Sequence, residues 1–280
     1  YSGPQMIEYP RFKIPYFVKI HGSYSFLSGF PGSISFDAKI YANERNNLLK
    51  ADTLIAVSEF AKRKLFEVYN YPFEIHVINN GVPIYDHVES NKTPESNKVI
   101  FAGTFSEQKG ILNLIKAWKY VIKEIADATL LIYGRGEHRF KQKMSNAISD
   151  DAKGTIIING FVEQKELLDA YAKAGCAIFP SFFETCGMAV LEAMQVGCPT
   201  IFTKNASGHE LINDGYNGLL VNPDDILGIA DKIIFLLKNR DYARRIGQNG
   251  ANTVKLKFDI NKVCKSHLEL YKEVLNNKSA

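Results

Sequence analysis

From residue 98 onward, short apolar runs typical of buried strands alternate with longer runs whose apolar residues recur at helical spacing. This alternation limits the fold more than any other feature of the chain, because strands joined through helices form a parallel sheet with helices on both faces. The expected strands are residues 98–104, 128–134, 154–160, 176–180, 199–203 and 218–221. The expected helices are residues 111–125, 138–148, 164–174, 225–239, 241–257 and 260–275, with another around Glu192.

The first ninety residues hold fewer such units. Strands are expected at residues 16–22, 52–58 and 74–81, and helices at 37–50 and 59–69. Three strands form only part of an independent α/β domain. The polar stretch "YDHVESNKTPESN" (Tyr85–Asn97) contains a proline and is predicted to be a linker. We therefore predict an α/β chain with a partial domain before this linker and a full α/β domain after it.

Ligands of parallel sheets bind beyond the carboxyl ends of the strands. In this chain those ends are the loops at residues 103–110, 134–137, 160–162 and 181–187. Each loop contains glycine, which permits close approach of the backbone to a ligand. The sequence therefore predicts that a binding site is built from these four loops.

The last of these loops opens "SFFETCGMAVLEAMQVGCP", where Glu184 and Glu192 stand eight residues apart among apolar and small residues. A helix that begins near Gly187 would turn free N–H groups toward the loop of Glu184, which suits a phosphate. If the segment were fully helical, Glu192 would lie about 12 Å further along the axis. The two carboxylates could then accept hydrogen bonds from hydroxyls of a sugar and a ribose. The alternative, that Glu192 faces solvent on an amphipathic helix, is equally compatible with the spacing.

Other polar residues carry weaker signals. Lys109 alone would be a solvated surface charge, but in a loop at the end of a strand it can pair with phosphate oxygens. His21 ends an apolar strand, and the ordinary interpretation is a core or capping histidine. Because we find no Walker A loop, G-x-S-x-G elbow, H-E-x-x-H or D-x-D motif, no metal or other cofactor is expected.

The composition is that of a globular protein, with 46% hydrophobic and 23% charged residues among 280. The net charge of +4 permits nucleotides or an acidic membrane surface as partners and does not demand nucleic acid. Four cysteines without a C-x-x-C pair are typical of a reduced, cytoplasmic protein. No apolar stretch reaches about 18 residues. The chain begins at Tyr1 rather than Met, so we expect a fragment or a processed protein.

Five segments, in this order, resemble the carboxyl-terminal donor domain of the family-four retaining glycosyltransferases, which have the GT-B fold of two facing Rossmann-like domains. They are "FAGTFSEQKGILNLIKAW", "LLIYGRGE", "INGFVEQKELLDAYAKAGCAIFPS", "FFETCGMAVLEAMQVGCPTI" and "SGHELINDGYNGLLVNPDD". The E-x7-E pair within them is the signature of that family. Upstream, "KIHG", "ADTLIAVSEFAKRKL" and "VINNGVP" resemble the second half of its amino-terminal domain. The resemblance implies a partial acceptor-side domain at residues 1–90, a donor domain at 91–255, and a helix returning to the first domain at 256–280.

The resemblance also implies a function. A hexosyl or N-acetylhexosaminyl group would pass from a nucleotide diphosphate sugar to a saccharide or lipid-linked acceptor hydroxyl, with retained configuration, in polysaccharide or glycolipid synthesis. No metal would take part, and peripheral contact with the inner face of a membrane would be compatible with such an acceptor. Glu184 would contact the hydroxyls of the donor sugar, Glu192 the ribose, and Lys109 the diphosphate, while His21 would reach the sugar from the acceptor side.

Further donor contacts follow from the same resemblance. Phe161 and Val162 would flank the base. The backbone at Cys186, Gly187 and Met188 would bind sugar and phosphate. The remaining donor-binding residues implied are Gly103 and Thr104.

The chain departs from the family pattern in two ways. Thr104 stands where the family commonly has an arginine after the glycine, and the first strands of the amino-terminal domain, with their glycine-rich loop, are not found. These departures leave open a non-catalytic subunit that binds a nucleotide sugar or a partner, and whether this chain alone is active. An epimerase of the same architecture would need acid and base groups in the first domain, and a phosphorylase would need a pyridoxal-type lysine, which we do not find. The sugar, base, acceptor and oligomeric state are not given by the sequence.

Overall fold

The computed structural model describes residues 15–23, 25–27, 37–85 and 96–279, which form two compact units. The first unit contains Tyr1–Pro83 together with Phe258–Ala280, and the second contains Ile84–Lys257. The structure thus divides the chain after residues 83 and 257, where the sequence analysis placed the divisions after 90 and 255. Most of the predicted linker, residues 86–95, lies outside the described part.

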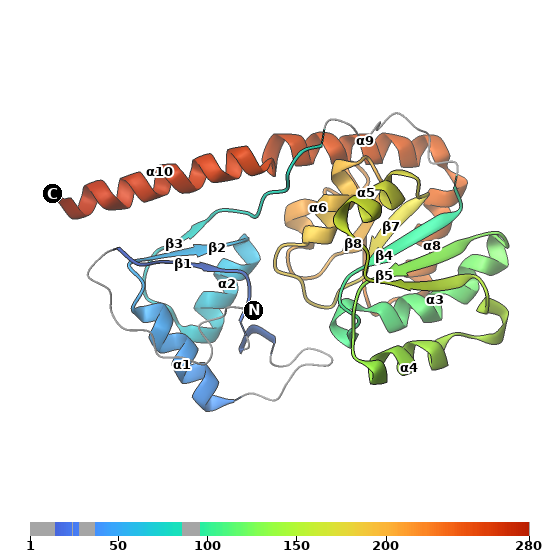
Figure 1. The fold of residues 1–280 in the computed structure, drawn as a ribbon, viewed down its shortest axis with the longest axis horizontal. Coiled ribbons are helices and arrows are strands. Elements are labelled where there is room, and N and C mark those ends of the chain that lie inside the picture. Colours follow the sequence, from blue (N-terminus) through green and yellow to red (C-terminus); the bar gives the residue numbers. More distant parts are fainter. Residues whose placement is uncertain (1–14, 24, 28–36, 86–95, 280) are drawn as a thin grey trace. The chain divides into compact units, whose positions relative to one another are not determined.

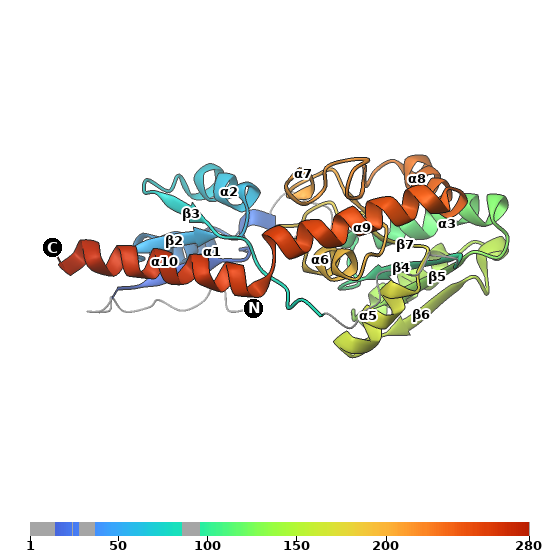
Figure 2. The ribbon, with the colours of Figure 1, turned by 90° about the horizontal axis from the view of Figure 1, so that it is seen from above.

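The first unit is built on a parallel sheet in the order β1-β2-β3 (Figure 1). A 3-10 turn and two helices follow the early strands, and the closing helix belongs to the same unit, in which the ring centroid of Tyr271 lies 4.6 Å from that of Phe17. Figure 2 shows this helix running along the region of the three strands. The elements are β1 (Phe17–Ile20), η1 (Ser25–Leu27), α1 (Ala38–Leu49), β2 (Thr53–Ala56), α2 (Glu59–Tyr69), β3 (Ile75–Val77) and α10 (Ile260–Ser279).

Side-chain caps explain where the early helices begin and end. The carboxylate of Asp37 accepts hydrogen bonds from the N–H groups of Lys39 and Ile40 at the start of α1. Ser58 accepts from the N–H of Ala61 at the start of α2. Asn70 ends α2 in the left-handed conformation, with φ of 45°. Each cap satisfies backbone groups that a helix terminus leaves unpaired.

The second unit is a six-stranded sheet in the order β6-β5-β4-β7-β8-β9, and every pair of neighbours in it is parallel. Helices cover both faces: α3 packs against α4 and α8, while α6 packs against α5 and α9 (Figure 1). The strands are β4 (Lys98–Ala102), β5 (Thr129–Tyr133), β6 (Ile156–Gly160), β7 (Cys176–Phe179), β8 (Thr200–Thr203) and β9 (Leu219–Val221). The helices and 3-10 turns are η2 (Glu107–Lys109), α3 (Ile111–Glu124), α4 (His138–Ala147), η3 (Asp150–Ala152), α5 (Gln164–Ala172), α6 (Met188–Gln195), α7 (Gly208–Leu211), α8 (Ile226–Lys238) and α9 (Arg240–Lys257).

The core of this unit surrounds Trp118 of α3, the single tryptophan of the chain, which is fully buried. Its indole N–H donates to the hydroxyl of Thr155 over 2.9 Å, so the one polar atom of the side chain is satisfied. The predicted α/β class with a parallel sheet is confirmed. Because all six strands run the same way, their carboxyl ends meet at one edge of the sheet and bring the four glycine-bearing loops together.

The helix that carries Glu192 begins directly after Gly187, where the sequence analysis expected it. The segment from Glu184 to Glu192 is not fully helical, because α6 begins only at Met188. Glu192 therefore lies four residues after the first residue of the helix, or about 6 Å along its axis instead of 12 Å.

Candidate functional site

Two charged residues from loops far apart in sequence meet at the carboxyl edge of the second sheet. Nζ of Lys109, which ends η2, lies 2.5 Å from Oε2 of Glu184, in the loop between β7 and α6. Both side chains are mostly shielded from solvent, with 25% and 19% of their surfaces exposed. They come together because β4 and β7 are neighbours in the sheet, so the loops that follow these strands are adjacent.

Backbone contacts fix the two loops that carry this pair. Gly110 has φ of 68°, and a Cβ at this position would lie 1.9 Å from the carbonyl oxygen of Pro180, so only glycine fits. The N–H of Phe182 donates to the carbonyl of Gln108 over 2.8 Å. The hydroxyl of the buried Ser207 donates to the carbonyl of Glu184 over 2.9 Å. The ion pair is therefore held by rigid backbone on both sides.

A hollow of about 330 Å³ lies at the same edge of the sheet. Its walls come from the loops after β4, β5 and β6 and from the start of α5 and α6. It is lined by Ala102, Gly103, Thr104, Tyr133, Gly134, Arg135, Phe161, Val162, Leu167, Ala189 and Glu192. Five residues predicted from the sequence therefore line one hollow: Gly103, Thr104, Phe161, Val162 and Glu192.

Glu192 is half-buried on α6 and does not simply face solvent. Its Oε1 accepts a hydrogen bond from the amide of Gln164 over 2.9 Å. Burial raises the pKa of Glu192, and the hydrogen bond from Gln164 opposes this effect. Behind it, the buried hydroxyl of Tyr171 has no hydrogen-bond partner among the described residues, and burial together with the charge of Glu192 raises the pKa of Tyr171. The carboxylate is thus oriented by Gln164, with a second oxygen left for a ligand.

Arg135 lines the hollow and was missed in the sequence analysis, although its loop was named there. Its guanidinium carbon lies 3.6 Å from the centroid of the Phe161 ring, a close cation–π contact. Phe161 itself is 57% exposed, so much of its surface is accessible to a ligand. A cation within a glycine-rich loop at a strand end was the signal that could have found Arg135.

The residues predicted around the start of α6, Cys186, Gly187 and Met188, lie outside the hollow. Gly187 is the N-cap of α6 and provides no side-chain cap to the N–H groups that begin the helix. Cys186 is buried and its Sγ lies 4.0 Å from Sδ of the exposed Met188. None of these three residues lines the hollow, and their predicted backbone contacts to a donor stay predictions.

His21 belongs to the first unit, at the end of β1, and its place relative to the second unit is not described. Its Nδ1 lies 3.2 Å from the side-chain amide of Asn80. Partial burial of the ring lowers the pKa of His21, and the nearby Lys19 and His267 add to this effect. A role for His21 at the donor sugar stays a prediction.

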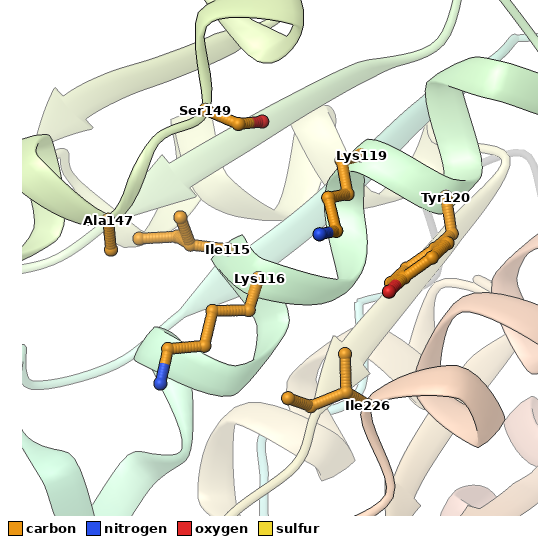
Figure 3. Close-up of a pocket in the computed structure, with 7 residues that line it drawn as sticks. All are labelled: Ile115, Lys116, Lys119, Tyr120, Ala147, Ser149 and Ile226. Atoms are coloured by element: carbon orange, nitrogen blue, oxygen red, sulfur yellow. The ribbon is translucent and has the colours of Figure 1, made fainter.

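A second hollow, of about 220 Å³, lies on the outer side of α3 (Figure 3). Its walls are Ile115, Lys116, Lys119 and Tyr120 of α3, Ala147 at the end of α4, Ser149, and Ile226 at the start of α8. Four of these residues lie on α3, and none of the seven lies in the loops that follow β4, β5, β6 and β7. No residue predicted from the sequence lines this hollow.

Within the described residues, no three His, Cys, Asp or Glu side chains are grouped so as to hold a metal ion. The expectation that no metal is required stays a prediction. No helix among these residues has the length and apolar character needed to cross a bilayer.

Comparisons with known proteins identify the class that this fold and this edge of the sheet define. Residues 85–253 match the family model of glycosyl transferases group 1, and residues 1–85 match that of glycosyltransferase family 4. The chain belongs to the group 1 glycosyltransferases, so the resemblance found in the sequence is confirmed. The relative MJ1069 of Methanocaldococcus jannaschii, named a glycosyltransferase, is 26% identical over 81% of this chain and 60% of its own length.

Solved structures agree on the fold. The sucrose-phosphate synthase of Thermosynechococcus elongatus superposes with a TM-score of 0.83 at 21% identity, over 95% of this chain and 69% of that one. Anabaena HepE in complex with UDP and glucose superposes with a TM-score of 0.79 at 19% identity, over 92% of this chain and 72% of that one. The fold is GT-B, with two Rossmann-like domains, as predicted.

Proposed function

We propose that this chain carries the donor site of a retaining glycosyltransferase that moves a hexosyl or N-acetylhexosaminyl group from a nucleotide diphosphate sugar to an acceptor hydroxyl. The observation that carries the proposal is the arrangement at the carboxyl edge of the second sheet. The Lys109–Glu184 pair joins the loops after β4 and β7, and Glu192 lines the hollow at the same edge of the sheet. The start of α6 lies between Glu184 and Glu192 in the chain. The structure of HepE, which has the same fold, contains UDP and glucose, and this supports a nucleotide sugar as donor here.

The proposed roles follow from charge and geometry. In the reaction the bond between the anomeric carbon and the diphosphate oxygen breaks, a bond to the acceptor oxygen forms on the same face, and the acceptor proton passes to the leaving phosphate. Negative charge builds on the diphosphate, so fixed cations and N–H groups stabilise the transition state. Lys109 and the N–H groups at the start of α6 would perform this task.

The two glutamates would position the donor at its ends. Glu184 accepts hydrogen bonds from sugar hydroxyls, and it keeps Lys109 oriented before the donor arrives. Glu192 accepts from the ribose through the oxygen that Gln164 leaves free. We also propose an acceptor that is a saccharide or a lipid-linked sugar, synthesis of a polysaccharide or glycolipid, a cytoplasmic location with peripheral membrane contact, and transfer without a metal.

Calorimetric titration with UDP, GDP and ADP, and with their glucose and N-acetylglucosamine conjugates, tests the donor site. We expect one nucleotide to bind. The sugar of its conjugate should pass to an acceptor with unchanged anomeric configuration, with release of the nucleoside diphosphate, and product analysis in the presence of an acceptor measures this transfer. Replacing Lys119, an exposed lysine of the α3 hollow, by Ala is the matched control for charge and should change neither result. Binding without any transfer would favour the non-catalytic subunit, and no binding would overturn the donor site.

A further inference from the structure

The proposed donor brings more negative charge than the pair described above can balance. A nucleoside diphosphate carries at least two negative charges at neutral pH, whereas the ammonium of Lys109 is already matched by the carboxylate of Glu184 at 2.5 Å. Among the residues that line the hollow, only Arg135 and Glu192 have ionisable groups that are charged near neutral pH. A diphosphate in this hollow therefore needs a cation, and Arg135 is the residue there that has one.

The order of the strands places the loop of Arg135 between two other loops that line the hollow. β5 lies between β6 and β4, so the loop of Arg135 stands between the loop of Phe161 and the loop of Thr104. The carbonyl of Arg135 accepts from the N–H of Phe105 over 2.6 Å. The preceding Gly134 has φ of 140°, and a Cβ there would lie 1.9 Å from the carbonyl oxygen of Gly103. The loops after β4 and β5 are thus in direct backbone contact.

The guanidinium of Arg135 is oriented but not neutralised. It lies over the ring of Phe161 and, within the described part of the chain, forms no hydrogen bond or ion pair with a carboxylate. A guanidinium has its N–H donors in its plane, so a ring against one face leaves those donors available. This planar fork matches two phosphate oxygens in a way that a lysine ammonium does not.

We propose that Arg135 is a phosphate-binding residue of the donor site, held over Phe161 and directed to the diphosphate beside Thr104. The inference rests on the proposed function, since it needs a nucleotide donor in this hollow. Under this proposal the positive charge on the diphosphate comes from Arg135 in the loop after β5, since the loop after β4 has the uncharged Thr104 at its edge of the hollow.

Calorimetry on Arg135→Ala tests this assignment, with the nucleoside diphosphate that binds the wild type and the corresponding nucleoside as probes. Loss of charge-assisted hydrogen bonds to phosphate should weaken binding of the diphosphate by about tenfold or more. The affinity for the nucleoside should fall by less than about twofold, because the nucleoside has no phosphate for Arg135 to contact. The affinity of Arg135→Lys for the diphosphate should lie between those of the wild type and Arg135→Ala. Lys119→Ala, which removes the same charge elsewhere on the unit, should bind as the wild type does.

A second substitution tests whether a cation on the neighbouring loop can replace Arg135. In the Arg135→Ala background, Thr104→Arg should restore part of the diphosphate affinity, because the two loops are in backbone contact. Equal losses for nucleoside and diphosphate would show that Arg135 acts on the base, and unchanged diphosphate affinity would show no role; either result overturns the assignment. Failure of the wild type to bind any nucleotide would instead overturn the proposed function, and this inference with it. Tryptophan emission of Trp118 during urea unfolding verifies that each variant is folded.

Discussion

Replacing Gly110 by Ala should damage both the stability of the second unit and nucleotide binding. The left-handed backbone at Gly110, with φ of 68°, would cost an alanine about 1–2 kcal/mol. The added Cβ would also lie 1.9 Å from the carbonyl oxygen of Pro180, which is backbone and cannot rotate away. Relieving such overlap costs typically about 1–3 kcal/mol, so the total loss should be about 2–5 kcal/mol.

Gly154 is the matched control for the conformational part of this loss. It also has a left-handed backbone, with φ of 82°, but a Cβ at this position would have no neighbour within 4 Å. Gly154→Ala should therefore lose only about 1–2 kcal/mol. The difference between the two variants isolates the contact between the loop of Lys109 and the loop of Glu184.

Urea unfolding, followed by the emission of Trp118, measures both losses, because this single tryptophan is buried in the second unit. Calorimetry on the folded variants measures nucleotide binding, which should fall in Gly110→Ala and remain in Gly154→Ala. Equal losses of stability in the two variants, with binding intact in both, would refute the view that this close approach holds the site together.

Three further substitutions address buried polar groups. Burial raises the pKa of Glu192 in the folded protein above its value in the unfolded chain. The contribution of the neutral carboxyl to the free energy of unfolding is therefore fully present below the unfolded pKa, and it is lost as the pH rises through the folded pKa. Glu192→Gln should therefore melt near the wild type at pH 4 and above it at pH 8; a difference that does not vary with pH would contradict this. Tyr171→Phe removes a buried hydroxyl without a partner among the described residues and should raise the free energy of unfolding by about 1 kcal/mol. Tyr69→Phe is the contrasting variant, because the hydroxyl of Tyr69 donates a hydrogen bond to the carboxylate of Glu44 over 2.6 Å. The substitution leaves this buried carboxylate without that donor, so the free energy of unfolding should fall by about 1–3 kcal/mol. Urea titrations giving the same sign for both tyrosines would be inconsistent with this explanation.

Local signals in the sequence predicted the elements well where a cap marks their ends. α2 begins and ends at the predicted residues, because Ser58 caps its start and Asn70 takes the left-handed conformation after its last turn. The start of α6 directly after Gly187 was also expected from the sequence, whereas α10 continues beyond the predicted Leu275 to Ser279.

Contacts between loops were harder to predict, because they depend on the order of strands in the sheet. Lys109 and Glu184 are 75 residues apart and meet only because β4 neighbours β7. Arg135 reaches Phe161 because β5 neighbours β6. Strand alternation in a sequence gives the class of fold, but it does not state which strands are neighbours. The family pattern supplied the importance of Lys109 and Glu184, and no motif pointed to Arg135.

The most direct test of the account compares Glu184→Ala and Glu192→Ala in calorimetric titrations with a nucleoside diphosphate and with its sugar conjugate. If Glu192 binds the ribose, its loss should weaken both ligands alike, by about tenfold for a hydrogen bond to a charged group. If Glu184 binds the sugar, its loss should weaken binding of the conjugate by a similar factor and should not weaken binding of the free diphosphate, because the ammonium of Lys109 remains. Equal losses for both ligands in both variants would contradict the claim that the two glutamates hold opposite ends of a nucleotide sugar.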